Sequence, residues 1–239
     1  MLKKIGSKNY AQFKALLGEA KRNSDPLWCK LFYRPLSFPI GWLLYKMGMK
    51  ANYVSISSIF LSIISALILI FGSSNISLIA SLLMVLIALL DCIDGNIARA
   101  RGETGPGGDW MDALSGYTVY ALLPLALGIH IYLHNPYPAF PGLWIIIGAL
   151  TSIANLFPRL LYQKFINSKL DKTIQKGSAG SRGSAFSKLS GEMGLVGWMM
   201  PALFVACVSD FLGVYLAFYC FFYVMSAILV TIILGLKIA

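Results

Sequence analysis

The chain has 239 residues, of which 57% are hydrophobic and only 13% are charged, and its mean hydropathy is +0.71. Because about a quarter of the residues in soluble domains are charged, this composition excludes an ordinary soluble globular domain. The formal net charge of +10 is not accompanied by a basic–aromatic platform or a nucleic-acid-binding motif, so we expect no nucleic-acid partner.

The N-terminal part of the chain is amphipathic. Residues 1–34 alternate charged and apolar positions, which predicts one or two helices lying on a membrane surface. The stretch from Pro35 to Met49 is apolar but contains Pro39 and Lys46, and it is short for a membrane span. We interpret it as an interfacial or juxtamembrane helix, so that residues 1–50 form a first, cytoplasmic unit.

Long apolar runs follow, at the length of about 20 residues that a helix needs to cross a bilayer. They are continuous and do not alternate, which disfavours a membrane β-barrel. We therefore predict an all-α integral membrane protein whose residues 51–239 form a six-span domain. The predicted spans are 53–72, 76–99, 110–133, 142–163, 190–208 and 211–236.

The placement of basic residues predicts the orientation. Ten of the 20 Lys and Arg lie in 1–50, two flank position 100, and seven lie between Arg159 and Lys188. The short turns near 73–76, 134–141 and 209–211 carry none. By the positive-inside rule, both termini and the 159–190 segment face the cytoplasm of a cell (inner or plasma) membrane.

Four aspartates stand out in this membrane-like sequence. Ionisable groups near membrane depth are costly and mark functional sites by default. Two of them share one stripe of a helix with two small residues, within a sector of roughly 100°. The aspartates are Asp91, Asp94, Asp109 and Asp112, and the small residues are Gly95 and Ala98. The pattern indicates a metal site that a bulky ligand can approach.

The chemistry of these residues suits a phosphorylated nucleotide. Mg²⁺ prefers carboxylate oxygens and shares its ligand shell with phosphate oxygens. Asp91, Asp94 and Asp112, from two helix ends, are the expected ligands. Arg99 offers positive charge to a diphosphate, while Gly95 and Gly108 present bare backbone to the ligand. The sequence thus indicates nucleotide diphosphate chemistry at the cytoplasmic membrane face.

The spacing of these residues matches a known signature. The pattern Asp91-x2-Asp94-Gly95-x2-Ala98-Arg99-x8-Gly108-x3-Asp112 resembles that of the CDP-alcohol phosphotransferases, also called CDP-alcohol phosphatidyltransferases. The sequence Asn52-x2-Ser55 looks like the nucleotide contact of the same family. The resemblance covers about 50–130 by motif and six spans by architecture.

The resemblance implies an enzyme of lipid metabolism. The resemblance implies a six-helix membrane fold, often dimeric, with two divalent metal ions, Mg²⁺ or Mn²⁺. An alcohol attacks the β-phosphate of a CDP-alcohol such as CDP-diacylglycerol, and CMP leaves, in phospholipid or related glycoconjugate biosynthesis. The implied partners are that CDP-alcohol, a hydroxyl or polyol-phosphate acceptor, membrane lipids and a second copy of the chain. By position, the metal ligands would be Asp91, Asp94 and Asp112, and the CDP pocket would be lined by Asn52, Gly95, Ala98, Arg99 and Gly108.

One position departs from the family pattern. The fourth aspartate, a metal ligand or general base in the family, is replaced by Gly116. Asp109 does not align with it, but on an ideal helix it lies only about 20° from Gly116 around the axis. We therefore take Asp109 and Asp112 as the catalytic candidates. A simpler interpretation of Asp109 is a cap on the third span.

Two alternatives remain open. A second alignment, Gly105-x3-Asp109-x2-Asp112, would make the last two aspartates the family pair, but it shortens the arginine-to-glycine gap to five residues. The missing aspartate also fits a catalytically impaired member that binds CDP or metal as a regulatory or partner subunit. A transporter is disfavoured, because the acidic residues gather at one membrane face.

Overall fold

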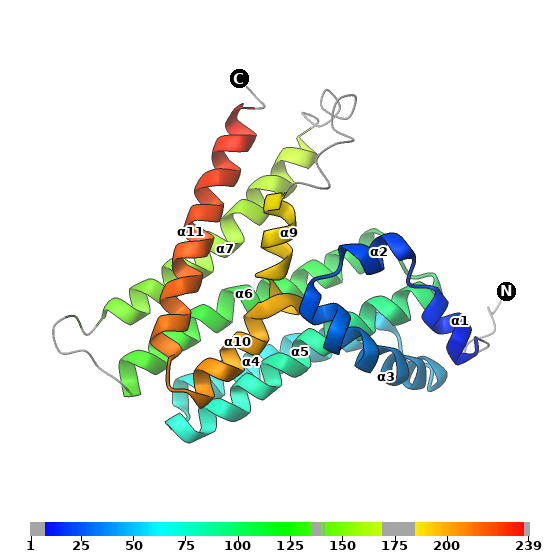
Figure 1. The fold of residues 1–239 in the computed structure, drawn as a ribbon, viewed down its shortest axis with the longest axis horizontal. Coiled ribbons are helices and arrows are strands. Elements are labelled where there is room, and N and C mark those ends of the chain that lie inside the picture. The colour runs from blue at the N-terminus through cyan, green and yellow to red at the C-terminus, as the bar shows by residue number, and fades with distance from the viewer. Residues whose placement is uncertain (1–7, 135–139, 141, 169–184, 237–239) are drawn as a thin grey trace.

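The computed structural model describes residues 8–134, 140, 142–168 and 185–236 (Figure 1). Within these ranges the chain forms helices and no strands. Six segments are long and apolar enough to cross a membrane, which confirms the predicted all-α, six-span fold. The division at residue 50 remains a prediction, and the predicted 164–189 link falls largely outside the described residues.

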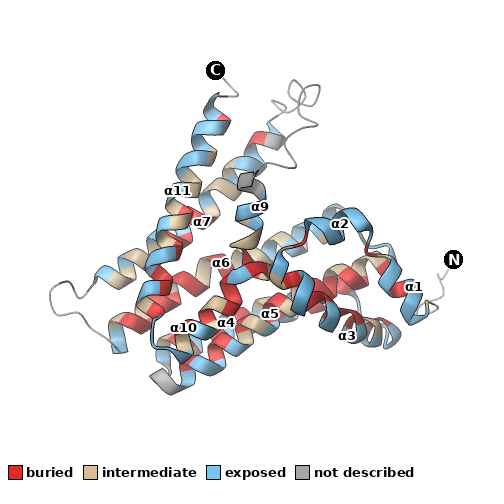
Figure 2. Cartoon of the chain, viewed as in Figure 1, coloured by how far each residue is buried: buried red, intermediate tan, exposed pale blue. Residues whose placement is uncertain are grey.

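Four spans are long, nearly uninterrupted helices: α4 (Ala51–Phe71), α5 (Ser74–Arg101), α6 (Pro106–His134) and α7 (Leu143–Asn167). Buried residues follow the lines along which α4, α5 and α6 meet (Figure 2). On α4 these include Ser55, Ser58, Ser62 and Ser65. Small side chains let membrane helices approach closely, and the Ser65 hydroxyl also donates to the Ala80 carbonyl of α5 at 2.8 Å.

Glycines set the contact between α6 and α7. A β-carbon on Gly128 would lie 2.3 Å from the Trp144 carbonyl oxygen, and one on Gly148 would lie 2.5 Å from the Pro124 carbonyl oxygen. Neither position has room for a side chain. The two backbones therefore touch directly at this crossing, as small-residue packing in membranes allows.

The fifth span, predicted over 190–208, covers Lys188–Val208, but it is not one continuous helix. It is made of α9 (Ala185–Glu192), a π-helical turn η3 (Leu195–Met199) and α10 (Met200–Val208). The backbone leaves helical geometry at Gly197, where ψ is −133°. Gly194 and Gly197 carry little helix propensity and Pro201 lacks an N–H donor, so this stretch breaks easily. The last span, α11 (Leu212–Leu236), is continuous.

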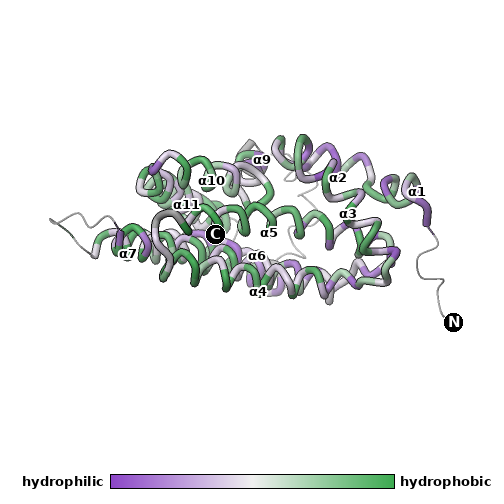
Figure 3. The backbone as a smooth tube through the Cα atoms, turned by 90° about the horizontal axis from the view of Figure 1, so that it is seen from below, coloured by the Kyte–Doolittle hydropathy of each residue, from purple (hydrophilic) through white to green (hydrophobic). Residues whose placement is uncertain are grey.

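The N-terminal segment is more divided than predicted. It forms α1 (Tyr10–Ala15), α2 (Glu19–Ser24), a π-helical turn η1 (Cys29–Tyr33) and α3 (Arg34–Lys46). Hydrophilic residues recur along α1 and α2, whereas the central part of α5 is hydrophobic (Figure 3). The segment is held to α5 by a separate small core of buried side chains, which includes Phe13, Phe38, Tyr45, Ile93 and Ile97. The segment is therefore packed onto the span that carries Asp91 and Asp94.

Candidate functional site

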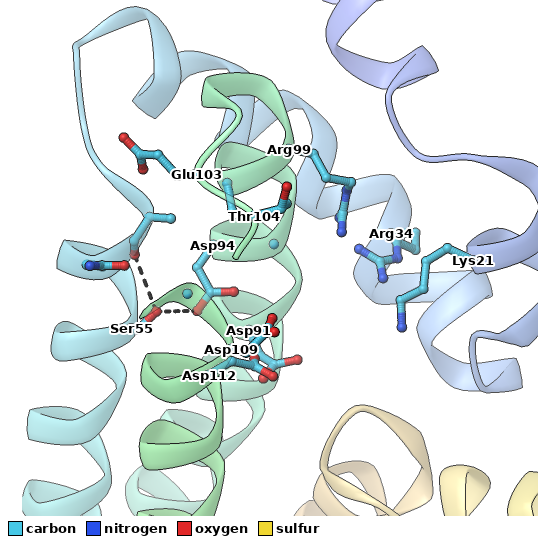
Figure 4. Close-up of a pocket in the computed structure, with 15 residues that line it drawn as sticks. Lys21, Arg34, Ser55, Asp91, Asp94, Arg99, Glu103, Thr104, Asp109 and Asp112 are labelled. Atoms are coloured by element: carbon cyan, nitrogen blue, oxygen red, sulfur yellow. Dashed lines mark hydrogen bonds between the residues drawn. The ribbon is translucent and has the colours of Figure 1, made fainter. Parts of the chain in front are cut away.

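A pocket of about 240 Å³ lies where the end of α5 meets the starts of α4 and α6 (Figure 4). The short turn between α5 and α6 brings the two helix ends together. Gly102 ends α5 with a left-handed φ of 69°, and Pro106 begins α6. All nine predicted site residues line this pocket: Asn52, Asp91, Asp94, Gly95, Ala98, Arg99, Gly108, Asp109 and Asp112.

The four aspartates lie on one side of the pocket. Asp94 is 4% exposed and accepts a hydrogen bond of 2.7 Å from the Ser55 hydroxyl. Figure 4 shows Asp91, Asp109 and Asp112 grouped below it, with Arg99, Arg34 and Lys21 across the pocket. None of the four aspartates forms an ion pair with a residue that the structure describes. Three basic residues thus share the pocket with the four carboxylates, yet none of the described side chains forms an ion pair with them.

Asp109 is not the cap of the third span. α6 begins at Pro106, several residues earlier than predicted, because proline suits the first turn of a helix. The Asp109 N–H already donates to the Gly105 carbonyl at 2.9 Å, within the helix. Its carboxylate still benefits from the positive end of the helix dipole, but it faces the pocket.

Gly116 is not among the lining residues. A β-carbon there would meet only the Tyr120 ring, at 3.9 Å, which is an ordinary contact. An aspartate at this position therefore has space for at least its first carbon atom. No packing conflict at that atom explains the glycine.

Arg99 lies over Gly95. A β-carbon on Gly95 would be 3.4 Å from both terminal guanidinium nitrogens. One of these nitrogens donates to the Asn96 Oδ1 at 2.8 Å, while the buried Nε of Arg99 has no hydrogen-bond partner in the described part of the chain. Gly95 therefore makes room for the arginine itself, which lines the pocket and whose buried Nε lacks a partner among the described residues.

Gly108 has a different role. A β-carbon there would lie 3.0 Å from the Glu103 carbonyl oxygen, so the tight turn between α5 and α6 favours glycine.

Two basic lining residues were not predicted, Lys21 of α2 and Arg34 of α3. Arg34 is buried and donates to both carboxylate oxygens of Asp25, at 2.6 and 3.1 Å. Its third contact is a 3.4 Å hydrogen bond to Asn96. Burial alone raises the pKa of Asp25, but the hydrogen bonds and charge of Arg34, with the charge of Lys21, outweigh it and lower that pKa. No local spacing in the sequence signals this arrangement.

The donor types in the pocket fit a divalent cation. Carboxylate oxygens are the ligands that Mg²⁺ and Mn²⁺ accept, and those of the aspartates lack a basic partner among the described side chains. Over the same ranges, no three His, Cys, Asp or Glu side chains are close enough to form a ligand shell by themselves. Phosphate oxygens of a nucleotide are the natural source of further ligands.

Comparison with known proteins identifies one family. Residues 49–164 match the family model for CDP-alcohol phosphatidyltransferase. This segment contains all nine predicted site residues and most of α4 to α7, but neither Lys21 nor Arg34. No curated protein matches the chain.

Proposed function

We propose that this chain is a membrane transferase that moves a phospho-alcohol group from a CDP-alcohol to a hydroxyl acceptor, because residues 49–164 match the model of the CDP-alcohol phosphatidyltransferase family. The donor is a lipid-linked one such as CDP-diacylglycerol, and the product belongs to phospholipid or related glycoconjugate biosynthesis. The observation that supports this most is the pocket that unites the unpaired carboxylates with the unpartnered Nε of Arg99.

The reaction is a displacement at phosphorus. The acceptor oxygen forms a bond to the β-phosphorus of the CDP-alcohol, and the bond from that phosphorus to the oxygen bridging the two phosphates breaks. CMP leaves with the bridging oxygen, and the acceptor proton passes to a base. Asp109 and Asp112 are the proposed bases, because both carboxylates face the pocket.

The remaining residues bind and orient the nucleotide. Asp91, Asp94 and Asp112 are the proposed ligands of one or two Mg²⁺ or Mn²⁺ ions, which when bound neutralise charge on the diphosphate. Arg99 donates to the phosphates, and charge from Lys21 and Arg34 adds to it across the pocket. The surface that receives the nucleotide is built from Asn52, Gly95, Ala98 and Gly108.

The test measures nucleotide binding and turnover separately. Calorimetry on the purified protein should show CDP binding that requires Mg²⁺ or Mn²⁺ and is lost in Asp94→Asn. CMP release from CDP-diacylglycerol, assayed with a panel of polyol and polyol-phosphate acceptors, should follow the same metal requirement. CDP binding with equal affinity in the presence and absence of Mg²⁺ or Mn²⁺ would contradict the proposed site.

A second function is favoured by one feature, the glycine at position 116. A family member without the fourth aspartate can keep CDP and metal binding and act as a regulatory or partner subunit. In that case wild type binds CDP with metal, yet neither wild type nor Gly116→Asp releases CMP with any acceptor. CMP release by wild type would exclude this alternative.

We also propose that the pocket faces the cytoplasm. Four basic side chains, Lys21, Arg34, Arg99 and Arg101, lie at or next to the pocket end of the bundle. The turn between α4 and α5, around Gly72 and Ser73, carries none. This asymmetry supports the orientation expected from the positive-inside rule. A homodimer, implied by the family, is proposed on that ground alone.

A further inference from the structure

A second pocket, of about 460 Å³, lies in the N-terminal segment. Four basic side chains line it: Lys14, Arg22, Lys30 and Arg34. Its apolar walls include Leu17 and Phe38, and no acidic residue is among its lining residues in the described chain. All of these positions lie outside the segment 49–164 that matches the family model. Apart from Arg34, which also lines the candidate active site, the residues of this pocket have no part in the proposed transfer reaction.

The charges in this pocket are largely uncompensated. Lys30 donates to the Asn23 carbonyl at 3.0 Å, and Lys14 lies 5.9 Å from the centre of the Phe38 ring. Of the four cations, only Arg34 pairs with a carboxylate in the described ranges. Arg34 is also 8% exposed, so a buried guanidinium forms part of the wall. Such a cluster attracts a bound anion.

The surroundings of the pocket identify the kind of anion. The same segment exposes a run of large apolar side chains, namely Leu27, Leu31, Phe32, Leu36, Ile40 and Leu43. An amphipathic segment of this kind lies at the boundary between headgroups and acyl chains. Basic groups beside that face are then at headgroup depth, where anionic lipids concentrate on the cytoplasmic leaflet.

We propose that this pocket binds the phosphate group of an anionic phospholipid in the host membrane. Its lysines and arginines contact the headgroup, and the neighbouring apolar side chains contact the acyl chains. Arg34 lines both this pocket and the candidate active site, so the lipid is bound directly beside the nucleotide pocket. The proposal concerns binding alone and does not depend on the proposed catalytic function.

The experiment uses the full-length protein in neutral-detergent micelles doped with phosphatidylglycerol or phosphatidylcholine, with bound lipid counted by native mass spectrometry. Wild type should retain phosphatidylglycerol at least tenfold better than phosphatidylcholine. The Arg22→Ala/Lys30→Ala variant should lose at least fivefold of that preference. The control, Lys50→Ala/Lys188→Ala, removes the same charge from exposed positions outside both pockets. This control variant should keep the wild-type preference for phosphatidylglycerol.

Two further measurements separate the possible outcomes. Arg22→Ala alone removes an exposed side chain and should lower the preference for phosphatidylglycerol at least twofold. This single variant keeps the test informative if the double variant misfolds. Inorganic phosphate at 10 mM, on the order of physiological levels, should not displace the lipid. Displacement by inorganic phosphate, or equal losses in the pocket and control variants, would overturn the proposal.

Discussion

The Ser55 hydroxyl donates a 2.7 Å hydrogen bond to the Asp94 carboxylate and thereby joins α4 to α5 inside the candidate active site (Figure 4). Both residues are 4% exposed, so this bond is shielded from solvent. Ser55 lies near the start of α4 and Asp94 lies near the end of α5, so their hydrogen bond helps to fix how the two helices meet at the pocket. The carboxylate is thus oriented by a neighbour 39 residues away.

We expect Ser55→Ala to weaken Mg²⁺-dependent CDP binding about tenfold, because a hydrogen bond to a charged group contributes about 1.5 kcal/mol. Calorimetry measures this change. Ser57→Ala is the matched control, since Ser57 is exposed on the same helix and, among the described residues, its hydroxyl donates to the Tyr53 carbonyl of its own helix. Ser55→Thr retains a hydroxyl and should restore much of the affinity. Equal affinities of the two alanine variants would show that the bond does not orient Asp94.

Asp109→Asn should lower the rate of CMP release at least tenfold and leave CDP affinity nearly unchanged. The reason is that general-base help typically contributes 10²–10⁴-fold, and the Asp109 carboxylate faces the pocket. Steady-state kinetics at saturating substrates measure the effect. Asp210→Asn, outside the pocket, is the control. If Asp109→Asn turns over at the wild-type rate, the acceptor supplies its own base or Asp112 serves alone.

Asp25→Asn should destabilise the protein by about 3 kcal/mol at neutral pH, because it leaves the buried guanidinium of Arg34 without its charge partner. Thermal unfolding in neutral detergent measures the loss. Glu19→Gln, an exposed acidic residue in the same segment, should change little.

The pH dependence of this loss follows from the lowered pKa of Asp25. The contribution of the pair to stability is complete above the ordinary value of 3.8 and disappears as the pH falls through the lower folded pKa. The difference in the free energy of unfolding between wild type and Asp25→Asn should therefore become smaller below pH 3.8. A difference that stays constant down to pH 2, about two units lower, would contradict this assignment.

Gly197→Ala should destabilise the protein by about 2 kcal/mol, since overpacking forces the backbone to move. A β-carbon there would lie 2.1 Å from the Glu192 carbonyl oxygen. The Glu192 carboxylate accepts a hydrogen bond from the Leu27 N–H, at 3.0 Å for each oxygen. A displacement of the Glu192 backbone should therefore weaken this bond and make the N-terminal segment easier to cleave. Thermal unfolding and limited proteolysis measure both effects. Gly191→Ala meets nothing within 4 Å and should be neutral or slightly stabilising.

The proposed orientation predicts the sidedness of chemical labelling. On a cysteine-free background, Lys188→Cys should react with a membrane-impermeant thiol reagent only in inverted vesicles. Ser209→Cys, just past the other end of the Lys188–Val208 span, should react only in intact cells. Both positions are exposed, so access depends on the membrane side alone. The reverse pattern would place the pocket on the outer face.

The sequence by itself determined the six spans and the aspartate motif. Span length and hydropathy are local properties, and the Asp91–Asp94–Gly95–Ala98 stripe follows from helix periodicity alone. These residues and the others that the family resemblance added, Asn52 among them, all line one pocket. The shared location of the α5 and α6 residues was predictable because the short turn after Gly102 brings two neighbouring helix ends together.

Only the tertiary structure decided which other parts of the chain complete the pocket. Arg34 reaches it because α3 packs on α5 through Phe38, Ile93 and their neighbours, across about 60 residues of sequence. Lys21 reaches it from α2, whose C-cap residue Asp25 pairs with Arg34. Hydropathy also could not show that the fifth span breaks at Gly197, since the surrounding residues are apolar on both sides of the break. Contacts between distant segments depend on the fit of whole helix surfaces, and no spacing within one segment encodes that fit.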